Sequence, residues 1–444
     1  MEQKTYYIET YGCQMNVYDS ELVSTMMHES GYKKTDDLNT ADAIFLNTCS
    51  IREKAEETVY NRLDNFQHLK RKNPSLLIGV LGCMAQNLKD ELLEHKPYVD
   101  IILGPDSYRN IPKIINDRSD KADHLVDTKL SKFEIYDDLV PSRSEGVSSW
   151  VSIMRGCDKF CTFCIVPFTR GRERSRPIKS IINEVKDGVN NGFVEFTLLG
   201  QNVNSYNSPD GKFPVLLDQV AQIDGLKRLR FMSPHPQDVD DHMLEVMAKH
   251  HNICNQVHLP LQAGSDRILK RMNRSYTSSE FLALVVKIKN YMPDCSITTD
   301  IIVGFPGETE EEFCETLSIA KKVRFNFAYM FKYSSRPGTK ASQYDDQISE
   351  DVKQKRLERL INLQLKNTLL QNRSYIYKTI RVLVEKESKK SNSQWSGRTE
   401  GGIWVVFDKN NEKIGDLVDI KIEDARGVTL FGSRVQGEYK YEVA

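Results

Sequence analysis

Strand-like and helix-like patterns alternate along most of this chain of 444 residues, and this alternation limits the folds open to it. The first series contains the strand-like runs TYYIETYGC, DAIFLNTC, LLIGVLGC and VDIILG, separated by helical stretches such as residues 19–30 and 52–72. Alternation of this kind is typical of a mainly parallel sheet with helices on both faces. We therefore expect a doubly wound α/β domain over residues 1–125, followed by a linker over residues 126–147.

A second alternating series follows the linker. Its six strand-like runs are WVSIM, FVEFTLLG, KRLRFMS, NQVHLPL, SITTDIIVGF and FNFAYMFKY, with helical stretches such as residues 178–191, 281–291 and 350–373. Six βα units predict a partial or complete α/β barrel over residues 148–373, with functional residues at the carboxyl ends of the strands. One helix start is marked by Thr309 and Glu312, which have the spacing of a capping box.

The pattern changes again over residues 374–444, where short strand-like runs alternate with glycine turns. The runs are TIRVLVE, QWSGRTEGGIWVVFD, DLVDIKIEDA and GVTLFGSRV. They predict a small OB-like β-barrel, so the whole chain is expected to be an α/β multidomain protein. The aromatic residues Trp395, Trp404 and Phe431 either stack nucleic-acid bases on this barrel or belong to its core.

The charge balance excludes a protein that coats nucleic acid with its whole surface. The 61 Lys and Arg residues oppose 62 Asp and Glu residues, which leaves a net charge of −1. Local basic stretches remain, with net charges of +5 over residues 155–179 and +7 over residues 352–381. A solvated face is the usual explanation of such stretches, and contact with phosphates is the other. No apolar run reaches the ~18 residues of a membrane-spanning helix, and no secretory signal pattern opens the chain.

Three of the nine cysteines, Cys157, Cys161 and Cys164, lie in one loop after the first strand of the second series. Without an export signal we expect a cytoplasmic, reducing compartment, where clustered cysteines indicate a metal or catalytic site rather than disulfides. Three thiolates this close can bind one soft metal centre, and a closed site usually has four protein ligands. One metal position is therefore expected to stay open to a small molecule. The alternative is a structural zinc ion with a distant fourth ligand.

Three other cysteines, Cys13, Cys49 and Cys83, are dispersed in sequence, but each directly ends a strand-like run of the first series. In an open parallel sheet the carboxyl ends of the strands lie along one edge, where ligands bind. We expect these thiols to converge on a second metal cluster, again with one open metal position. The alternative is three ordinary small buried residues. The last three match no cluster motif and are interpreted as core or near-surface thiols: Cys254, Cys295 and Cys314.

Seven motifs together resemble one known family. They are YGCQMNVYDSE, NTCSIREKAEE, GCMAQ, SIMRGCDKFCTFCIVPFTRGRERSR, LLGQNVNSY, SPHP and LPLQAGSDRILKRMNRSYT. Spread over nearly the whole chain, they resemble the methylthiotransferase family of radical S-adenosylmethionine enzymes. The resemblance implies an N-terminal three-cysteine domain, a central radical domain and a C-terminal TRAM domain that binds RNA.

The resemblance also implies two [4Fe-4S] clusters and S-adenosyl-L-methionine as cofactors. Cys157, Cys161 and Cys164 would hold the radical-generating cluster, whose open iron binds the amino and carboxylate groups of S-adenosylmethionine. The three strand-end cysteines would hold an auxiliary cluster that carries or supplies sulfur. The adenine of S-adenosylmethionine would lie against residues 301–304. Other contacts to S-adenosylmethionine are expected from Phe163, Gln201, Asn202, Ser233, Gln262 and Asp300.

The implied substrate is a tRNA whose adenosine 3′ to the anticodon carries an isopentenyl group on N6. One S-adenosylmethionine would methylate the sulfur, and a second would yield the radical that removes hydrogen from C2 of the adenine before methylthio transfer. We expect an electron-donor protein as a partner, no membrane and a monomer. A sibling enzyme that acts on threonylcarbamoyladenosine in tRNA or on a protein of the small ribosomal subunit is one alternative. A zinc-stabilised RNA-binding protein without catalysis is the other.

Overall fold

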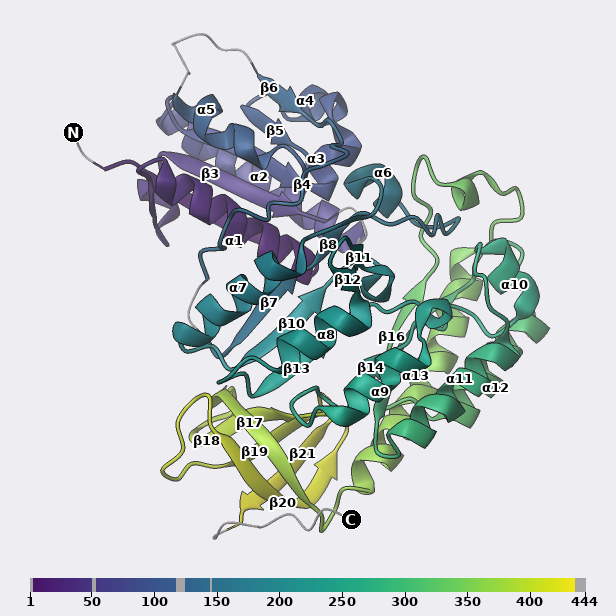
Figure 1. Ribbon diagram of the computed structural model, residues 1–444. Helices are drawn as coiled ribbons and strands as arrows, with labels where there is room; N and C mark the ends of the chain where they lie inside the picture. Colours follow the sequence, from purple (N-terminus) through teal and green to yellow (C-terminus); the bar gives the residue numbers. More distant parts are fainter. Residues whose placement is uncertain (1–2, 50–52, 117–123, 144–145, 436–444) are drawn as a thin grey trace.

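The structure is a computed structural model that describes residues 3–49, 53–116, 124–143 and 146–435. Figure 1 shows three stacked units, with the N-terminal α/β domain at one end, the C-terminal barrel at the other and the central domain between them. Within the described residues, no helix is both long enough and apolar enough to cross a lipid bilayer.

The N-terminal domain is built on a six-stranded, wholly parallel sheet in the order β2-β1-β3-β4-β5-β6. The strands are β1 Thr5–Tyr11, β2 Lys33–Lys34, β3 Ala43–Thr48, β4 Leu77–Gly82, β5 Ile101–Leu103 and β6 Leu125–Asp127. The helices are α1 Gln14–Glu29, α2 Glu53–Lys72, α3 Cys83–Leu88, α4 Asp90–His95 and α5 Ile111–Asn116. The doubly wound α/β prediction is confirmed.

This sheet has a hydrophobic core on each face, because successive residues of a strand point to opposite sides. Within β3, Phe45 belongs to the core formed with α1 and α5. Its neighbours Ile44 and Leu46 belong to the core formed with α2, α3 and α4. The nearly continuous apolar runs that predicted these strands therefore reflect burial on both faces.

The edges of this sheet differ from the prediction. β2 consists of two exposed lysines and β6 of exposed or half-buried residues, so neither strand has the apolar run by which a buried strand is recognised. β6 includes residue 125, so the sheet extends past the expected start of the linker. α1 begins at Gln14 rather than at residue 19, because Cys13 takes the N-cap position and its N–H donates to Asn16 Oδ1.

The central domain is a partial α/β barrel. Its six strands form two parallel sheets, β13-β10-β7 and β14-β15-β16, joined by a bridge between Leu229 and Ile253. Among the described residues β16 has no pairing with β7, so the barrel is open on that side. All six predicted strands are present, as β7 Ser148–Ser152, β10 Glu195–Leu199, β13 Arg228–Phe231, β14 Gln256–His258, β15 Ser296–Val303 and β16 Phe327–Lys332.

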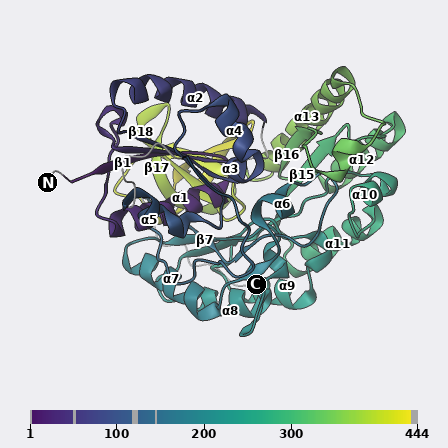
Figure 2. The same cartoon turned by 90° about the horizontal axis from the view of Figure 1, so that it is seen from above.

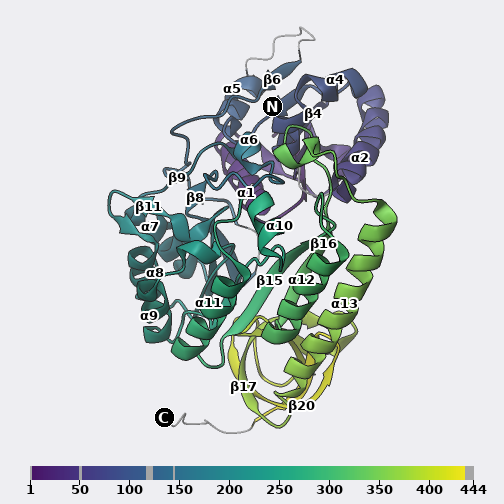
Figure 3. The same cartoon turned by 90° about the vertical axis from the view of Figure 1, so that its right-hand side faces the viewer.

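Helices cover the outside of this barrel, and Figure 3 shows α11, α12 and α13 side by side over its second half. The helices are α7 Ile178–Asn190, α8 Phe213–Ala221, α9 Asp241–Lys249, α10 Asp266–Arg271, α11 Ser278–Tyr291, α12 Glu310–Val323 and α13 Glu350–Arg373. The predicted capping box at Thr309 and Glu312 starts α12. Shorter elements are β8 Met154–Arg155, α6 Val166–Arg170, β9 Arg174–Ser175, β11 Asn207–Ser208 and β12 Gly211–Lys212.

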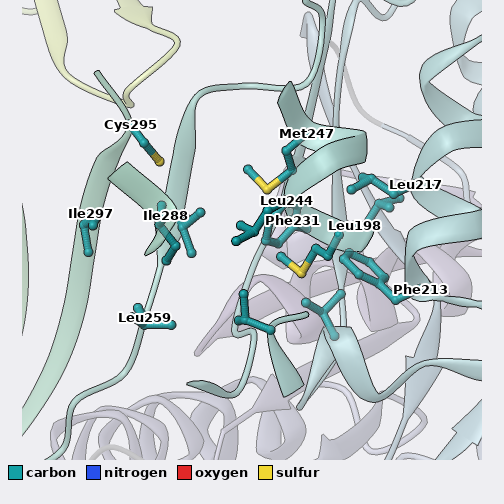
Figure 4. Packing of buried hydrophobic residues seen from close by; sticks show 14 of the residues in the cluster. Leu198, Phe213, Leu217, Phe231, Leu244, Met247, Leu259, Ile288, Cys295 and Ile297 are labelled. Carbon is teal, nitrogen blue, oxygen red and sulfur yellow. The ribbon is translucent and has the colours of Figure 1, made fainter. Parts of the chain in front are cut away.

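One continuous hydrophobic core fills the space between these strands and helices (Figure 4). Phe231 of β13 meets Phe213 of α8 edge to face, with ring centroids 5.4 Å apart. Cys295 lies in this core and Cys254 is also buried, whereas Cys314 is exposed. These three cysteines are core or near-surface thiols, as expected.

The C-terminal unit is a closed five-stranded barrel in the order β17-β18-β19-β21-β20, which confirms the OB-like prediction. Trp404 and Phe431 are half-buried and lie outside the barrel's core. Lys386 Nζ lies 4.5 Å from the ring centroid of Trp404, and the Arg426 guanidinium lies 5.0 Å from that of Phe431. Trp395 instead packs partly against that core. The strands are β17 Thr379–Ser388, β18 Ser391–Thr399, β19 Trp404–Asp408, β20 Leu417–Arg426 and β21 Thr429–Arg434.

This barrel is docked on the amino ends of the central strands. Arg230 of β13 donates from its two Nη atoms to the carbonyl oxygens of Glu400 and Thr399, at 2.7 and 2.9 Å. Glu195, the first residue of β10, accepts from Arg230 at 2.8 Å and from Arg398 at 2.7 Å. Burial alone would raise the pKa of Glu195, but the two guanidinium groups outweigh it and hold this pKa at about 2. The carboxyl ends of the strands lie opposite this contact, below the N-terminal domain (Figure 1).

Candidate active site

The cysteine loop, residues 157–164, follows β8 and is connected through α6 to β9, which pairs antiparallel with β8. Gly156 turns the chain from β8 into this loop with a φ of +79°. A Cβ at this position would lie 2.0 Å from the carbonyl oxygen of Arg172. Because that obstacle is backbone, only glycine fits here.

A second segment, which directly follows α10, holds the cysteine loop from the other side. Thr162 donates its N–H to the carbonyl oxygen of Met272 at 3.1 Å. The side-chain amide of Asn273 donates to two carbonyl oxygens of the loop at 3.0 Å. Arg274 Nη1 donates to Cys161 Sγ at 3.4 Å. The conformation of the loop is therefore determined by contacts on both of its sides.

The thiols of this loop are partly withdrawn from solvent. Burial raises the pKa of Cys157 to about 11 and that of Cys164 to about 12. At neutral pH these groups lose their protons only when a positive charge compensates the thiolate, and a bound metal centre supplies that charge.

Polar side chains that follow β10 and β14 contain buried oxygen atoms without a hydrogen-bond partner in the described structure: Gln201 Oε1, Asn202 Oδ1 and Gln262 Oε1. A buried acceptor without a partner costs about 1–3 kcal/mol, so these atoms suit a donor group such as the ammonium of an amino acid. The side-chain amide of Asn202 donates to Asp238 at 3.0 Å, and Asp238 pairs with Lys159 of the cysteine loop at 2.8 Å. Asn202 is thus tied to the loop.

Two of the predicted residues, Ser233 after β13 and Gln262 after β14, have left-handed backbones with φ of +60° and +66°. Such conformations are uncommon for residues other than glycine and cluster at functional sites. Gln262 is held in place by β15, because its N–H donates to Asp300 O at 2.8 Å and its carbonyl oxygen accepts from Ile302 at 2.9 Å.

The remaining predicted contacts are on β15 and in the cysteine loop. Asp300 Oδ2 lies 3.2 Å from His258 Nε2. Gly304 closes the predicted adenine segment with a φ of +70°, and its N–H donates to Glu308 at 2.6 Å. Burial raises the pKa of Glu308 to about 7. The ring of Phe163, by contrast, packs against the central core.

Three aromatic side chains on β16 were not predicted as site residues: Phe327, Tyr329 and Phe331 have exposed fractions of 39%, 43% and 42%. They share one strand face, because Met330 between them packs against the core on the other face. The register places Tyr329 beside Asp300 of β15. The period-two aromatic pattern in FNFAYMFKY was a signal that could have identified this face.

The three dispersed cysteines come together at one edge of the N-terminal sheet. β1, β3 and β4 are neighbours, and their register aligns the final residues of the three strands. A hydrogen bond between the thiols of Cys13 and Cys49 lowers the pKa of Cys13 to about 6. Cys83 is buried, and burial raises the pKa of its thiol.

Arginines of the basic stretch 155–179 connect the two domains. Arg155 and Arg170 both pair with Asp19 of α1, at 3.0 and 2.7 Å, and Arg174 pairs with Asp106 at 2.8 Å. The side chains of these three arginines and of their two carboxylate partners are at most 7% exposed. Both explanations of the stretch, a solvated face and phosphate contact, are therefore wrong for these arginines, because carboxylates of the N-terminal domain neutralise them.

The donor sets suit iron–sulfur clusters. Each contains three thiols and one arginine N–H near a sulfur, from Arg274 to Cys161 at 3.4 Å and from Arg170 to Cys83 at 3.2 Å. No group of three or more His, Cys, Asp or Glu residues in the described part of the chain is arranged to hold a metal ion. A [4Fe-4S] cluster does not require convergence on one atom, because each thiolate binds a separate iron.

Models of three protein families match the chain. The Radical SAM superfamily matches residues 151–320, the TRAM domain residues 373–435, and Uncharacterized protein family UPF0004 residues 5–104. A match to the Radical SAM superfamily implies a [4Fe-4S] cluster and S-adenosylmethionine as cofactors.

Solved structures show the same fold at low sequence identity. The radical S-adenosylmethionine methyltransferase TsrM from Kitasatospora setae, with cobalamin and a [4Fe-4S] cluster bound, has a TM-score of 0.60 and 14% identity over 77% of each chain. The cobalamin-dependent enzyme OxsB has a TM-score of 0.54 over 80% of this chain and 56% of its own.

Much closer relatives are called tRNA-2-methylthio-N(6)-dimethylallyladenosine synthase. The protein from Christiangramia forsetii is 47% identical over 97% of this chain and 93% of its own length. The protein from Parabacteroides distasonis is 48% identical over 98% of this chain and 96% of its own. With its three-cysteine loop at the strand ends of a partial barrel, this chain belongs to the tRNA-2-methylthio-N(6)-dimethylallyladenosine synthase family of radical S-adenosylmethionine enzymes.

Proposed function

We propose that the chain is a tRNA methylthiotransferase that converts N6-isopentenyladenosine, 3′ to the anticodon, into its 2-methylthio derivative. The main support is the short connection between two three-cysteine sites. α6 begins two residues after Cys164 and ends at Arg170, whose Nε donates to Cys83 Sγ at 3.2 Å. α6 also packs against α3, which starts at Cys83. This proximity suits one site that starts a radical reaction and one that delivers sulfur.

Two [4Fe-4S] clusters would divide the chemistry. When bound, the cluster on the cysteine loop would supply the electron that cleaves S-adenosylmethionine, and the cluster on Cys13, Cys49 and Cys83 would carry or supply the sulfur. The hydrogen on C2 of adenine is not acidic, so a general base is of no use and a radical route is required. The protein binds and orients the reactants, and the unpartnered oxygens of Gln201 and Gln262 would accept hydrogen bonds from the ammonium group of S-adenosylmethionine.

The aromatic face of β16 supports an apolar modification on the target adenosine. A dimethylallyl group gains about 0.8 kcal/mol for each CH₂ that it buries against rings such as Tyr329 and Phe331. The carboxylate of a threonylcarbamoyl group would lose hydration on the same face and would meet Asp300, the neighbour of Tyr329 in the register. This contrast favours the isopentenyladenosine enzyme over the sibling that acts on threonylcarbamoyladenosine.

The RNA has to bring its base to the aromatic face of β16 in the central barrel, so the target adenosine leaves its stack. The outward rings of Trp404 and Phe431, each close to a cation, are suited to stack neighbouring bases. We further propose that the protein acts as a monomer in a reducing cytoplasm and receives its electrons from a partner protein.

The test is a reaction with three synthetic anticodon stem-loops under anaerobic conditions, with dithionite as reductant. The loops are identical except that the target adenosine is isopentenylated, threonylcarbamoylated or unmodified. We expect 2-methylthio product, detected by mass spectrometry, only from the isopentenylated loop. Product from the threonylcarbamoylated loop would instead assign the chain to the sibling activity.

Iron analysis tests the number of clusters. We expect about eight irons per chain, falling to about half when either three-cysteine set is changed to alanine. The exposed Cys314→Ala variant is the control and should retain all of its iron. An unchanged iron content after replacement of Cys13, Cys49 and Cys83 would rule out the second cluster.

A further inference from the structure

Arg170 belongs to the central domain, yet its side chain lies in the cysteine site of the N-terminal domain. It is the last residue of α6, only 3% exposed, and its Nε donates to Cys83 Sγ at 3.2 Å. The other two cysteines of that site, Cys13 and Cys49, follow strands adjacent to each other in the same sheet. A cation from a second domain thus faces the sulfur atoms of the first.

Two of the three nitrogen atoms of the Arg170 guanidinium have partners, because Nε contacts Cys83 and Nη2 contacts Asp19. Nη2 donates to Asp19 Oδ2 at 2.7 Å, and Asp19 is fully buried in α1. Nη1, by contrast, is buried and has no partner in the described structure. A buried donor of a charged group is costly to leave unpaired, so Nη1 suits an acceptor that a bound group would bring to this position.

A sulfur atom of the proposed cluster is an acceptor that suits this position. Arg170 Nε donates to Cys83 Sγ at 3.2 Å, so the guanidinium already lies against one sulfur of this site. Three thiolates around one iron–sulfur cluster form an anionic group, and sulfur atoms of such a cluster accept hydrogen bonds. An arginine held by a carboxylate on one side can present its remaining N–H groups to that sulfur without losing its orientation.

We propose that Arg170 completes the auxiliary cluster site, with Nε and Nη1 as hydrogen-bond donors to sulfur and Asp19 as the group that orients the guanidinium. Arg170 is then a positioning residue that raises the reduction potential of this cluster, because N–H donors and positive charge stabilise its reduced, more negative state. The inference rests on the proposed function, since it takes the auxiliary cluster from there. It adds that the site is shared between two domains.

A purely structural role for Arg170 is the competing explanation, and Arg174 provides the matched control. Arg174 is buried at the same interface and pairs with Asp106 at 2.8 Å, but the described structure gives it no contact with sulfur. If Arg170 only holds the domains together, Arg170→Gln and Arg174→Gln should have similar effects on every property. If Arg170 acts on the cluster, only its replacement should change the potential.

The experiment uses the full chain with Cys157, Cys161 and Cys164 changed to alanine, so that only the auxiliary cluster can assemble. After anaerobic reconstitution, iron is counted and the cluster is titrated with dithionite while the reduced form is followed by electron paramagnetic resonance. For Arg170→Gln we expect at least a tenfold shift of the one-electron equilibrium toward the oxidised state, or about 59 mV. Arg170→Lys keeps the charge but loses the planar fork, and should give a smaller shift in the same direction.

The outcomes separate this inference from the proposed function. A parent chain that takes up no iron would overturn the auxiliary cluster and the role of Arg170 with it. A parent that takes up about four irons, with equal potentials in Arg170→Gln and Arg174→Gln, would overturn the role of Arg170 alone. A shift confined to the Arg170 variants would support it.

Discussion

Replacement of Asp19 by asparagine should undock the N-terminal domain from the central domain. Asp19 is fully buried and accepts hydrogen bonds from Arg155 at 3.0 Å and from Arg170 at 2.7 Å. The substitution keeps the size of the side chain but removes its charge and places an NH₂ group against the guanidinium groups. Arg155 and Arg170 then both lie buried without a carboxylate at this position.

The expected cost follows from what each cation retains. Removing one partner of a buried ion pair costs about 3–5 kcal/mol, because the other charge stays buried without compensation. Arg155 keeps a hydrogen bond to Pro105 O at 3.0 Å and a distant contact to Asp106 at 3.7 Å, and Arg170 keeps Cys83. We therefore expect Asp19→Asn to weaken docking of the two domains by an amount near the lower limit, about 3 kcal/mol. This corresponds to about two powers of ten in the docking equilibrium constant.

Trp150 gives a specific signal for this contact. It lies in β7, which packs against α1, and its ring contacts the core of the N-terminal domain. The other two tryptophans, Trp395 and Trp404, are in the C-terminal barrel and can be changed to phenylalanine. Urea unfolding of the metal-free protein, followed by Trp150 fluorescence, should show a midpoint at least ~1 M lower for Asp19→Asn.

The control is Asp36→Asn, which removes a carboxylate from an exposed position of the same domain. Surface substitutions of this kind usually change stability by less than ~0.5 kcal/mol. If the midpoint of Asp19→Asn matched that of Asp36→Asn, the buried ion pairs would not be what holds the two domains together.

Three further changes test other parts of the central domain. Gly156→Ala should lower the iron bound after reconstitution to about half, because its Cβ meets backbone, whereas Gly31→Ala, with a φ of +85° and open space around it, should leave iron unchanged. Burial, aided by Arg274 and Lys159, lowers the pKa of His235 to about 2, so the unfolded chain binds a proton below pH ~6.5 that the folded chain does not. The free energy of unfolding should therefore fall by about 1.4 kcal/mol per pH unit below pH ~6.5. His235→Asn should remove this slope, and the control His242→Asn, at an exposed position, should retain it. Equal slopes in the two variants would refute the assignment. Tyr329→Ser should lower kcat/KM for the isopentenylated stem-loop about tenfold, because it removes apolar contact with the substrate. The control Phe133→Ser, at an exposed position, should leave kcat/KM unchanged. An unchanged kcat/KM in Tyr329→Ser would show that β16 is not part of the substrate site.

The convergence of the three strand-end cysteines could be predicted, because it follows from the order of the strands. Cys13, Cys49 and Cys83 each follow a strand, and parallel strands align their carboxyl ends, so the chain order of strands was enough to bring them together. The edge strands β2 and β6 escaped prediction because strands exposed at an edge lack the apolar run of a buried one.

The ion pairs between the domains could not be predicted from local patterns. Asp19 and Arg170 are 151 positions apart, and a cluster of arginines beside an active-site loop looks the same whether it faces phosphates or buried carboxylates. The aromatic face of β16 is an intermediate case. Its alternation of Phe327, Tyr329 and Phe331 is visible in the sequence, but its exposure depends on the barrel remaining open.

Figure 2 shows the N-terminal domain seen from above, with the central domain extending beside it. In this arrangement the domain that carries Cys13, Cys49 and Cys83 lies over the strand ends of the domain that carries the cysteine loop. We propose that this pair of sites methylthiolates isopentenyladenosine in tRNA. The most direct test is nucleoside mass spectrometry of tRNA from cells that lack this protein. We predict that 2-methylthio-N6-isopentenyladenosine disappears and that N6-isopentenyladenosine accumulates in its place. An unchanged pool of the methylthio nucleoside would contradict it.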